Sequence, residues 1–456
     1  MSTSRTRRTL LRLASALALS AGFGAIAAPA WADDCAGGPV KLSFSFWGSV
    51  NEKHDVEEAI TNWNKNKPCI QVQPLYIPAT GTNYVQKLST MIASNTAPDI
   101  GYLGESQAFQ WATEGKILDL SPYMGPTPEQ QYVKSTIYHA GKVLMGTGLA
   151  TGVMLIYYNK DVFDAAHVAY PPAKASQAWT WDQFVANAKK LTKDRSGKTP
   201  DEAGFDSENI DTYGVTLPSW WGGWYPFVLS NGGHFASDDG KTLLLNQPAA
   251  VEALQKFKDL IYVDHVMPNP TQTSTLPTGD VLMQSRKVAM SMDGMWRVTD
   301  FAKLGINWGV AVLPKFKEPD TIVLSVPKVI FSQTKHPKEA FEFYKYISDP
   351  AQVGLFKSGL WAPHEKAYFT DPKLLATWVT APGSAYPPEA MDAIVDYTLN
   401  HAPEQSPVYW LKDVGPILDQ AVAPNIQKML NDPNETAQQA MDDAVKTAAP
   451  LMHGRW

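Results

Sequence analysis

The chain has 456 residues but only two cysteines, and past residue 32 it has no apolar run that approaches a membrane span. A spanning helix needs about 20 predominantly apolar residues, so the body of the chain is not expected to be embedded in a bilayer. The nine histidines show neither an HExxH motif nor paired zinc-ligand spacing, and no GxSxG elbow occurs. These absences argue against the commonest zinc and serine hydrolases.

One short match to an enzyme motif is present. Residues 325–328 read Ser-Val-Pro-Lys, which fits the SxxK nucleophile motif of penicillin-binding enzymes. The companion KTG and SDN motifs are missing, so the match is interpreted as chance. Acid pairs suited to glycoside hydrolysis need a fold to be recognised, and sequence alone leaves that chemistry open.

The chain is mildly acidic. The formal net charge is −6, and residues 1–32 contain four arginines and no acids, which leaves −10 on residues 33–456. Nucleic-acid-binding proteins present basic surfaces, so no nucleic-acid partner is expected.

Residues 1–32 have the layout of a secretory signal peptide. A basic start is followed by an apolar stretch over residues 13–28, and Ala30 and Ala32 occupy the two positions that a signal peptidase reads. We expect cleavage near Ala32 and a periplasmic location. The Arg7-Arg8 pair also fits a twin-arginine signal, so the ordinary and the twin-arginine route both stay open.

The two cysteines, Cys35 and Cys69, lie close to this predicted cleavage site. An even pair in an oxidising compartment predicts one disulfide. The alternatives are two unpaired thiols and lipidation of Cys35. Against lipidation, Asp33 and Asp34 precede Cys35 where lipoproteins carry small or apolar residues.

Alternating strand and helix patterns follow the leader. Period-two or apolar strand patterns cover residues 40–46, 70–75 and 98–103, and helical patterns cover 52–65 and 85–94. This alternation predicts a parallel sheet with helices on both faces, in which ligands meet the loops at the carboxyl ends of the strands.

A second α/β block is predicted further along. Thr180 and Gln183 form a capping box that opens a helix ending near residue 191, and residues 234–245 read as a hairpin. The other elements predicted here are strands at 153–158, 288–292 and 310–313, a helix at 251–263, and mostly helix after residue 339. The length calls for two domains or lobes.

Several motifs recur in an order that resembles one family. They are Phe46-Trp47-Gly48, Ala97-Pro98-Asp99-Ile100, Gly115 to Ser121, Tyr157 to Phe163, Thr180 to Phe184 and Gly294-Met295-Trp296. In this order and spacing the chain resembles the carbohydrate-class extracellular solute-binding proteins of ABC importers, the group that contains maltose-binding protein. One departure is residues 321–328, which carry Pro327 and no glycine.

The resemblance implies a two-lobed α/β fold, each lobe a mainly parallel sheet flanked by helices, with the ligand cleft between the lobes. We assign residues 1–32 to the signal peptide, 33–148 with 293–350 to lobe 1, and 149–292 with 351–456 to lobe 2. Crossings between the lobes are expected near 147–153, 292–296 and 348–353, and closure would be a hinge motion.

The resemblance and the loop positions together suggest ligand contacts. Sugar hydroxyls need fixed donors and acceptors, and sugar ring faces stack on aromatic side chains. For each tryptophan the alternative is core packing, and for Asp293 it is helix capping. The candidates are Trp47, Ser49, Glu105, Ser106, Trp220, Trp221, Trp224, Asp293, Trp296, Arg297 and Trp361.

The function that this resemblance implies is capture of a sugar, oligosaccharide or polyol for a membrane permease. We expect a monomer without a cofactor, metal or enzymatic activity. Two alternatives stay open: a secreted carbohydrate-active hydrolase, and the same fold binding a non-sugar ligand such as a glycerophosphodiester. The second would need cationic groups, of which Arg297 is the one candidate.

Overall fold

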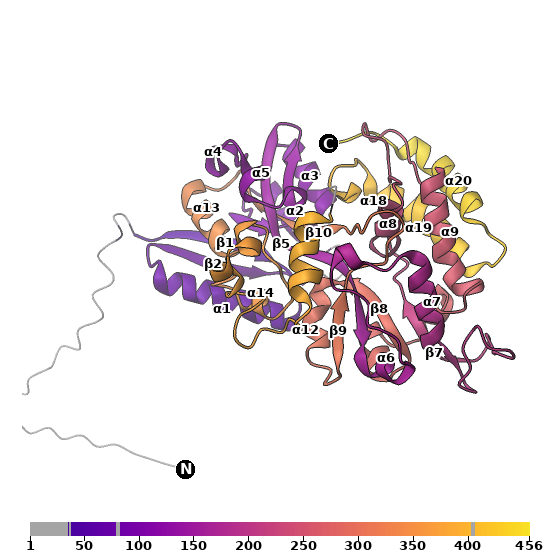
Figure 1. Ribbon diagram of the computed structural model, residues 1–456. Helices are drawn as coiled ribbons and strands as arrows, with labels where there is room; N and C mark the ends of the chain where they lie inside the picture. Colours follow the sequence, from indigo (N-terminus) through magenta and orange to yellow (C-terminus); the bar gives the residue numbers. More distant parts are fainter. Residues whose placement is uncertain (1–34, 36–37, 79–82, 403–405) are drawn as a thin grey trace, which may run out of the picture.

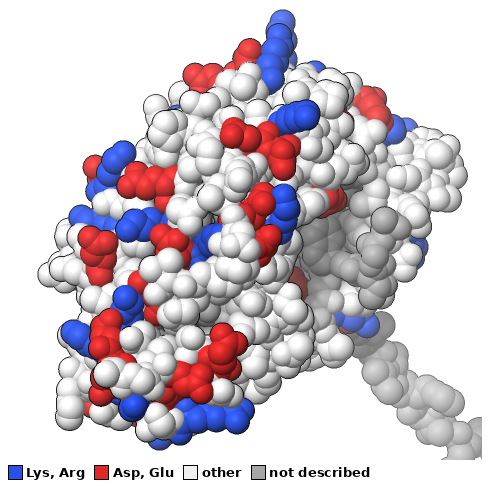
Figure 2. Space-filling model, turned by 90° about the vertical axis from the view of Figure 1, so that its right-hand side faces the viewer, with Lys and Arg blue, Asp and Glu red and all other residues white. Residues whose placement is uncertain are grey.

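The computed structural model describes residues 35, 38–78, 83–402 and 406–456, so the predicted signal peptide lies outside the described residues. Among the described residues, no helix is long and apolar enough to cross a membrane. The face in Figure 2 mixes acidic and basic side chains without a basic patch.

The strands are β1 (Val40–Phe46), β2 (Ile70–Tyr76), β3 (Ile100–Tyr102), β4 (Ile137–Ala140), β5 (Val143–Asn159), β6 (Lys193–Asp194), β7 (Ile210–Thr216), β8 (Val288–Gly294), β9 (Trp308–Ala311) and β10 (Val323–Ile330).

The helices are grouped on both sides of these strands (Figure 1). The longer ones are α1 (Val50–Asn66), α2 (Asn83–Ala93), α3 (Glu105–Thr113), α7 (Trp181–Leu191), α8 (Trp221–Ser230), α9 (Pro248–Tyr262), α13 (Pro337–Tyr346), α19 (Ala423–Asn431) and α20 (Ala437–Ala448). The shorter ones used below are α12 (Val298–Phe301), α14 (Gly354–Lys357) and η3 (Met295–Arg297).

The first half of the fold is a three-layer sandwich. Strands β2, β1 and β3 run parallel, as the alternation of strands and helices predicted. The apolar stripe of α1, which includes Val56, Ile60 and Trp63, packs on the face of β1 that carries Phe44. The buried residues of α2 and α3 form a separate core on the opposite face. This arrangement leaves the loops after β1 and β3 at one edge of the sheet.

Strand β5 joins the two halves of the molecule. Its first part pairs antiparallel with β4 and β10, and its second part pairs antiparallel with β8 and β9. The sheet therefore continues from one lobe into the other, in the order β2-β1-β3-β10-β5-β8-β7-β6. The two-lobed α/β fold class is confirmed. Strand direction in the second half is mixed: among the strands described there, β7 and β8 pair in parallel, while β5 pairs antiparallel with β8 and β9 and β6 pairs antiparallel with β7.

The departure noted around Pro327 has a structural explanation. The register between β10 and β5 shifts between Ser325 and Pro327. Proline has no N–H for a sheet ladder, and an irregular point in the pairing accommodates it. Its carbonyl still accepts a hydrogen bond from the backbone N–H of Leu103, which ties β10 to the end of β3.

The lobe boundaries stay a prediction. Strand β9, which the sequence assigned to lobe 1, pairs with the second part of β5 beside β8. Strand β10 then pairs with both β5 and β3. This pairing favours a return to the first lobe along β10, later than the boundary at residue 293 that we expected.

Cys35 and Cys69 form a disulfide, with their Cα atoms 5.4 Å apart. The bond joins the segment before β1 to the start of β2, where the Val40 N–H also donates to the Cys69 carbonyl at 2.9 Å. Cys35 therefore has no free thiol in this structure.

Candidate ligand-binding site

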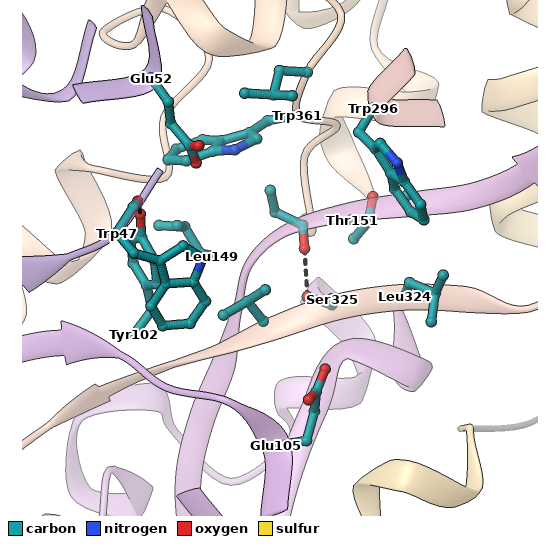
Figure 3. A pocket seen from close by; sticks show the side chains of 14 residues that line it. Trp47, Glu52, Tyr102, Glu105, Leu149, Thr151, Trp296, Leu324, Ser325 and Trp361 are labelled. Atoms are coloured by element: carbon teal, nitrogen blue, oxygen red, sulfur yellow. Dashed lines mark hydrogen bonds between the residues drawn. The ribbon is translucent and has the colours of Figure 1, made fainter. Parts of the chain in front are cut away.

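A cavity of about 240 Å³ opens at the centre of the molecule, where β5 and β10 cross between the halves. Figure 3 shows Trp47 and Trp296 on opposite sides of it, with Trp361 and Glu105 at two further sides. The lining residues are Trp47, Glu52, Tyr102, Glu105, Leu149, Ala150, Thr151, Gly152, Trp296, Leu324, Ser325, Val326, Leu360 and Trp361. Four of the residues predicted from sequence, Trp47, Glu105, Trp296 and Trp361, thus meet here.

Trp47 is held rigidly on the loop after β1. Its ring lies edge-on to Tyr84 and Tyr102, with centroid separations of 4.8 and 4.4 Å. The Tyr102 hydroxyl donates to the Trp47 carbonyl, and the Tyr84 hydroxyl donates to the Tyr102 carbonyl at 2.9 Å. A fixed aromatic surface loses little conformational entropy when a ligand packs on it.

Ser49 caps helix α1 instead of lining this cavity. Its hydroxyl accepts from the Glu52 N–H, and the Glu52 carboxylate accepts from the Ser49 N–H, each at 3.2 Å. This capping box turns Glu52 back over the helix start and toward Trp361. The cap therefore positions a carboxyl group that the sequence prediction overlooked.

Trp361 covers one side of the cavity. It is only 6% exposed and lies edge-on to Phe356 at the end of α14, 5.5 Å between ring centroids. Burial raises the pKa of Glu52 to about 7, while hydrogen bonds from the Ser49 backbone and the Trp361 side chain oppose that shift. The Trp361 side chain thus lies beside a carboxyl group of the cavity.

Glu105 opens helix α3 directly after β3. Its side chain is half-buried and lines the cavity, and desolvation raises its pKa to about 7. Only its own backbone amide opposes that shift. A carboxyl at the first turn of a helix also faces the positive end of the helix dipole.

Trp296 lies in η3, just past β8. Its ring packs over two glycines: a Cβ on Gly152 would lie 3.2 Å from the ring, and one on Gly294 only 2.1 Å. Both positions must therefore stay without a side chain for the indole to reach the cavity.

A second, outer cavity of about 610 Å³ shares Glu52, Trp296 and Leu360 with the first. Ser49 and Arg297, predicted as ligand contacts, line this outer cavity. Trp296 therefore contacts both spaces.

The Arg297 guanidinium forms ion pairs with neighbouring aspartates. It contacts Asp280 at 2.6 Å, Asp300 at 2.7 Å and Asp293 at 3.7 Å. Asp293 also accepts from the Gly294 N–H at 2.7 Å, and burial raises its pKa. Asp293 lines neither cavity.

The remaining predicted contacts are elsewhere. Trp220 is 39% exposed and lines a separate hollow with Pro268 and Gln427. Trp224 is buried and stacks on Phe235 in the core, as the packing alternative would have it. Trp221, beside Trp220, and Ser106, exposed on α3, line neither the inner nor the outer cavity.

Sequence reasoning missed several lining residues. Tyr102 is the last residue of β3, and Glu52 is the third residue after the predicted loop position Ser49, so both carried a positional signal. The backbone segments 149–152 and 324–326 did not, because they enter the cavity only through the pairing of β5 with β10. Within that pairing the Ser325 hydroxyl donates to the Ala150 carbonyl, so it is not part of an SxxK dyad.

Residues 48–354 match the family described as bacterial extracellular solute-binding protein. The chain belongs to this family. Membership of an extracellular solute-binding family agrees with the export expected from residues 1–32.

Two curated relatives each share about a quarter of the aligned residues with this chain. A binding protein of Brucella abortus is 24% identical over 270 residues, 58% of this chain and 61% of its own length. The chain thus spans about three fifths of the first curated relatives. A multiple sugar-binding protein of Streptococcus mutans is 23% identical over 68% of this chain and 71% of its own.

Solved structures show the same fold. An ABC substrate-binding protein of Listeria monocytogenes, in complex with cycloalternan, superposes with a TM-score of 0.72. It is 22% identical, and the match covers 91% of this chain and 99% of that one. The fold expected of a solute-binding protein is confirmed.

Proposed function

We propose that this protein is the exported substrate-binding component of an ABC importer, and that it captures a sugar, oligosaccharide or polyol in the inner cavity. The single observation that carries the proposal is the cavity at the β5–β10 crossing, where three tryptophans and two carboxyls converge. Ring faces of sugars pack on indoles, and their hydroxyls bond to carboxyl groups and backbone atoms. The relatives named for binding sugars support the same ligand class.

The protein acts in the periplasm as a monomer and delivers its ligand to a membrane permease. The signal-like residues 1–32 and the Cys35–Cys69 disulfide support export to an oxidising compartment. Ligand would bridge Trp47 on one side and Trp296 on the other, which favours the closed arrangement of the lobes. A closed lobe pair is the form that a permease would recognise.

The experiment is a sugar and polyol panel tested by thermal shift on residues 33–456. A ligand at about 100 times its dissociation constant stabilises the folded state by about 2.7 kcal/mol. Stabilisation by at least one neutral or amino sugar is expected. A panel without any response would contradict the ligand class.

Hydrolysis is tested on the same samples. Glu52 and Glu105 are carboxyls on a cleft, the groups that a glycosidase uses, so each bound glycoside is recovered and examined for cleavage. Intact recovery is expected. Turnover would replace the binding function with the hydrolase alternative.

The glycerophosphodiester alternative receives no support from the cleft. The fourteen described residues of the inner cavity include no lysine, arginine or histidine. Arg297 faces the outer cavity and is engaged by three aspartates. In the inner cavity an anionic ligand would therefore meet carboxyls and no cation of the described lining.

A further inference from the structure

The described lining of the inner cavity carries acidic side chains without basic ones. The two acids are Glu52 and Glu105. No ion pair reaches either acid within the described part of the chain. A carboxylate removed from water without a countercharge is unfavourable, and the pKa of both groups is raised to about 7 by burial. The described lining therefore offers neither acid a countercharge.

The two acids differ in the hydrogen bonds that their carboxyl groups accept from the protein. The Glu52 carboxylate accepts a hydrogen bond from the Ser49 N–H, and the Trp361 side chain lies beside it. Among the described residues, no other side chain bonds to Glu105, whose only opposing contact is its own backbone amide. Glu105 is thus the carboxyl with unused capacity, and it points into the cavity in Figure 3.

The surrounding rings favour a positive charge. Trp47, Tyr102, Trp296 and Trp361 line the cavity that contains Glu105. The face of an aromatic ring attracts a cation, and the attraction is strongest when the site excludes water. The nearby Arg297 cannot supply the countercharge, because its guanidinium contacts Asp280, Asp293 and Asp300.

We propose that the ligand is an amino sugar, whose protonated amine pairs with Glu105 inside the ring of aromatic side chains. This inference rests on the proposed sugar-binding function and narrows its ligand class. A free ammonium group satisfies the carboxylate and the ring faces at once, whereas a neutral hydroxyl or an N-acetyl group satisfies only the hydrogen bonds.

The test compares matched sugars that differ in one substituent. Glucosamine, galactosamine and mannosamine, and the disaccharide of two β-1,4-linked glucosamines, are each titrated beside their N-acetylated and hydroxyl counterparts. Isothermal titration calorimetry on residues 33–456 at pH 7 measures the affinities. At least one amine should bind ten times more tightly than both of its counterparts, which is about 1.4 kcal/mol.

Proton release gives a second readout. Near pH 7 about half of the Glu105 carboxyls are protonated in the empty cavity, because the pKa is about 7. An ammonium group favours the ionised form, so binding should expel up to about half a proton from Glu105, and Glu52, with the same raised pKa, adds to the total. Calorimetry in two buffers with different ionisation enthalpies measures this number, and a neutral sugar should release none.

Variants assign the effect to one residue. Glu105→Gln keeps the side-chain shape but removes the charge, so it should abolish the tenfold preference and reduce the proton release. Glu114→Gln is the matched control, because Glu114 lies outside the cavity at the other end of the same helix. It should behave like the wild type.

The outcomes separate this inference from the broader function. If neutral or N-acetylated sugars bind and no amine is preferred, the amino-sugar inference is wrong and the sugar-binding function stands. If Glu105→Gln retains the full preference for the amine, the assignment to Glu105 is wrong. If no sugar of either kind binds, the inference and the proposed function both fail.

Discussion

Single residues decide what this cleft can hold. Trp296 reaches the inner and outer cavities because Gly152 and Gly294 carry no side chain beneath its ring. Trp220, with its comparable exposed indole, lies in a different hollow. Substitution of Trp296 therefore removes an indole from the site, and substitution of Trp220 removes one outside it as the control.

Trp296→Ala is expected to weaken binding of any sugar ligand by about tenfold or more, since it removes the aromatic surface shared by both cavities. Trp220→Ala should leave the affinity unchanged. Both are measured by calorimetry with the best ligand of the panel. Equal affinities for the two variants would remove Trp296 from the site.

Titration of the cavity carboxyls gives a pH prediction. The pKa of Glu105 is raised from 4.5 to about 7 in the folded protein. Between pH 4.5 and pH 7 the folded state therefore binds more protons than the unfolded state. Its contribution to stability is present below pH 4.5 and is lost as the pH rises to about 7. Urea unfolding between pH 4.5 and 8 should show a smaller decline for Glu105→Gln than for the wild type. An identical decline would contradict a desolvated, unpaired Glu105.

What the sequence could and could not predict is clearest at this scale. Trp47 and Glu105 follow strands whose alternation was readable, and Trp296 and Trp361 came from the family resemblance. Trp224 was predicted as a ligand contact, but it lies on the apolar helix α8 and packs into the core. Ser49 was predicted as a ligand contact, but it caps α1, and sequence alone does not distinguish a capping serine from any other loop serine. Segments 149–152 and 324–326 depend on a pairing between residues about 170 positions apart, which local patterns do not carry.

Among the elements, α1 links fold and site most directly. The capping box of α1 sets the direction of the Glu52 side chain, and the apolar stripe of α1 packs the helix on the sheet. The strand and helix patterns of this region were predicted closely, because each has a one-faced apolar period and clear end signals.

Ser49→Ala should lower the free energy of unfolding by about 1 kcal/mol, the usual contribution of an N-cap. Because Ser49 lies outside the inner cavity, ligand affinity should change less than threefold. Chemical denaturation and calorimetry on the same protein measure both values. A large affinity loss with unchanged stability would restore Ser49 as a ligand contact.

The disulfide contributes to the same region. It closes a loop with a sequence separation of 34, which corresponds to about 3–4 kcal/mol in the chain-entropy estimate. The Cys35→Ser, Cys69→Ser double variant should unfold at correspondingly lower urea concentration. Wild-type stability in the double variant would show that the bond does not constrain the unfolded chain.

At the scale of the whole molecule, the continuous path through β5 and β10 places the cavity where the two halves join. Ligand contacts from both halves make binding and lobe closure a coupled equilibrium. Small-angle scattering should therefore show a smaller radius of gyration with saturating ligand than without it. An unchanged radius would mean that binding occurs without closure.

The most direct test of the central claim is calorimetric titration of residues 33–456 with the sugar and polyol panel, carried out in parallel on Trp296→Ala. The account predicts saturable binding of one ligand per chain, without turnover, and a loss of about tenfold or more in the variant. Absence of binding across the panel, or binding that Trp296→Ala leaves unchanged, would contradict it.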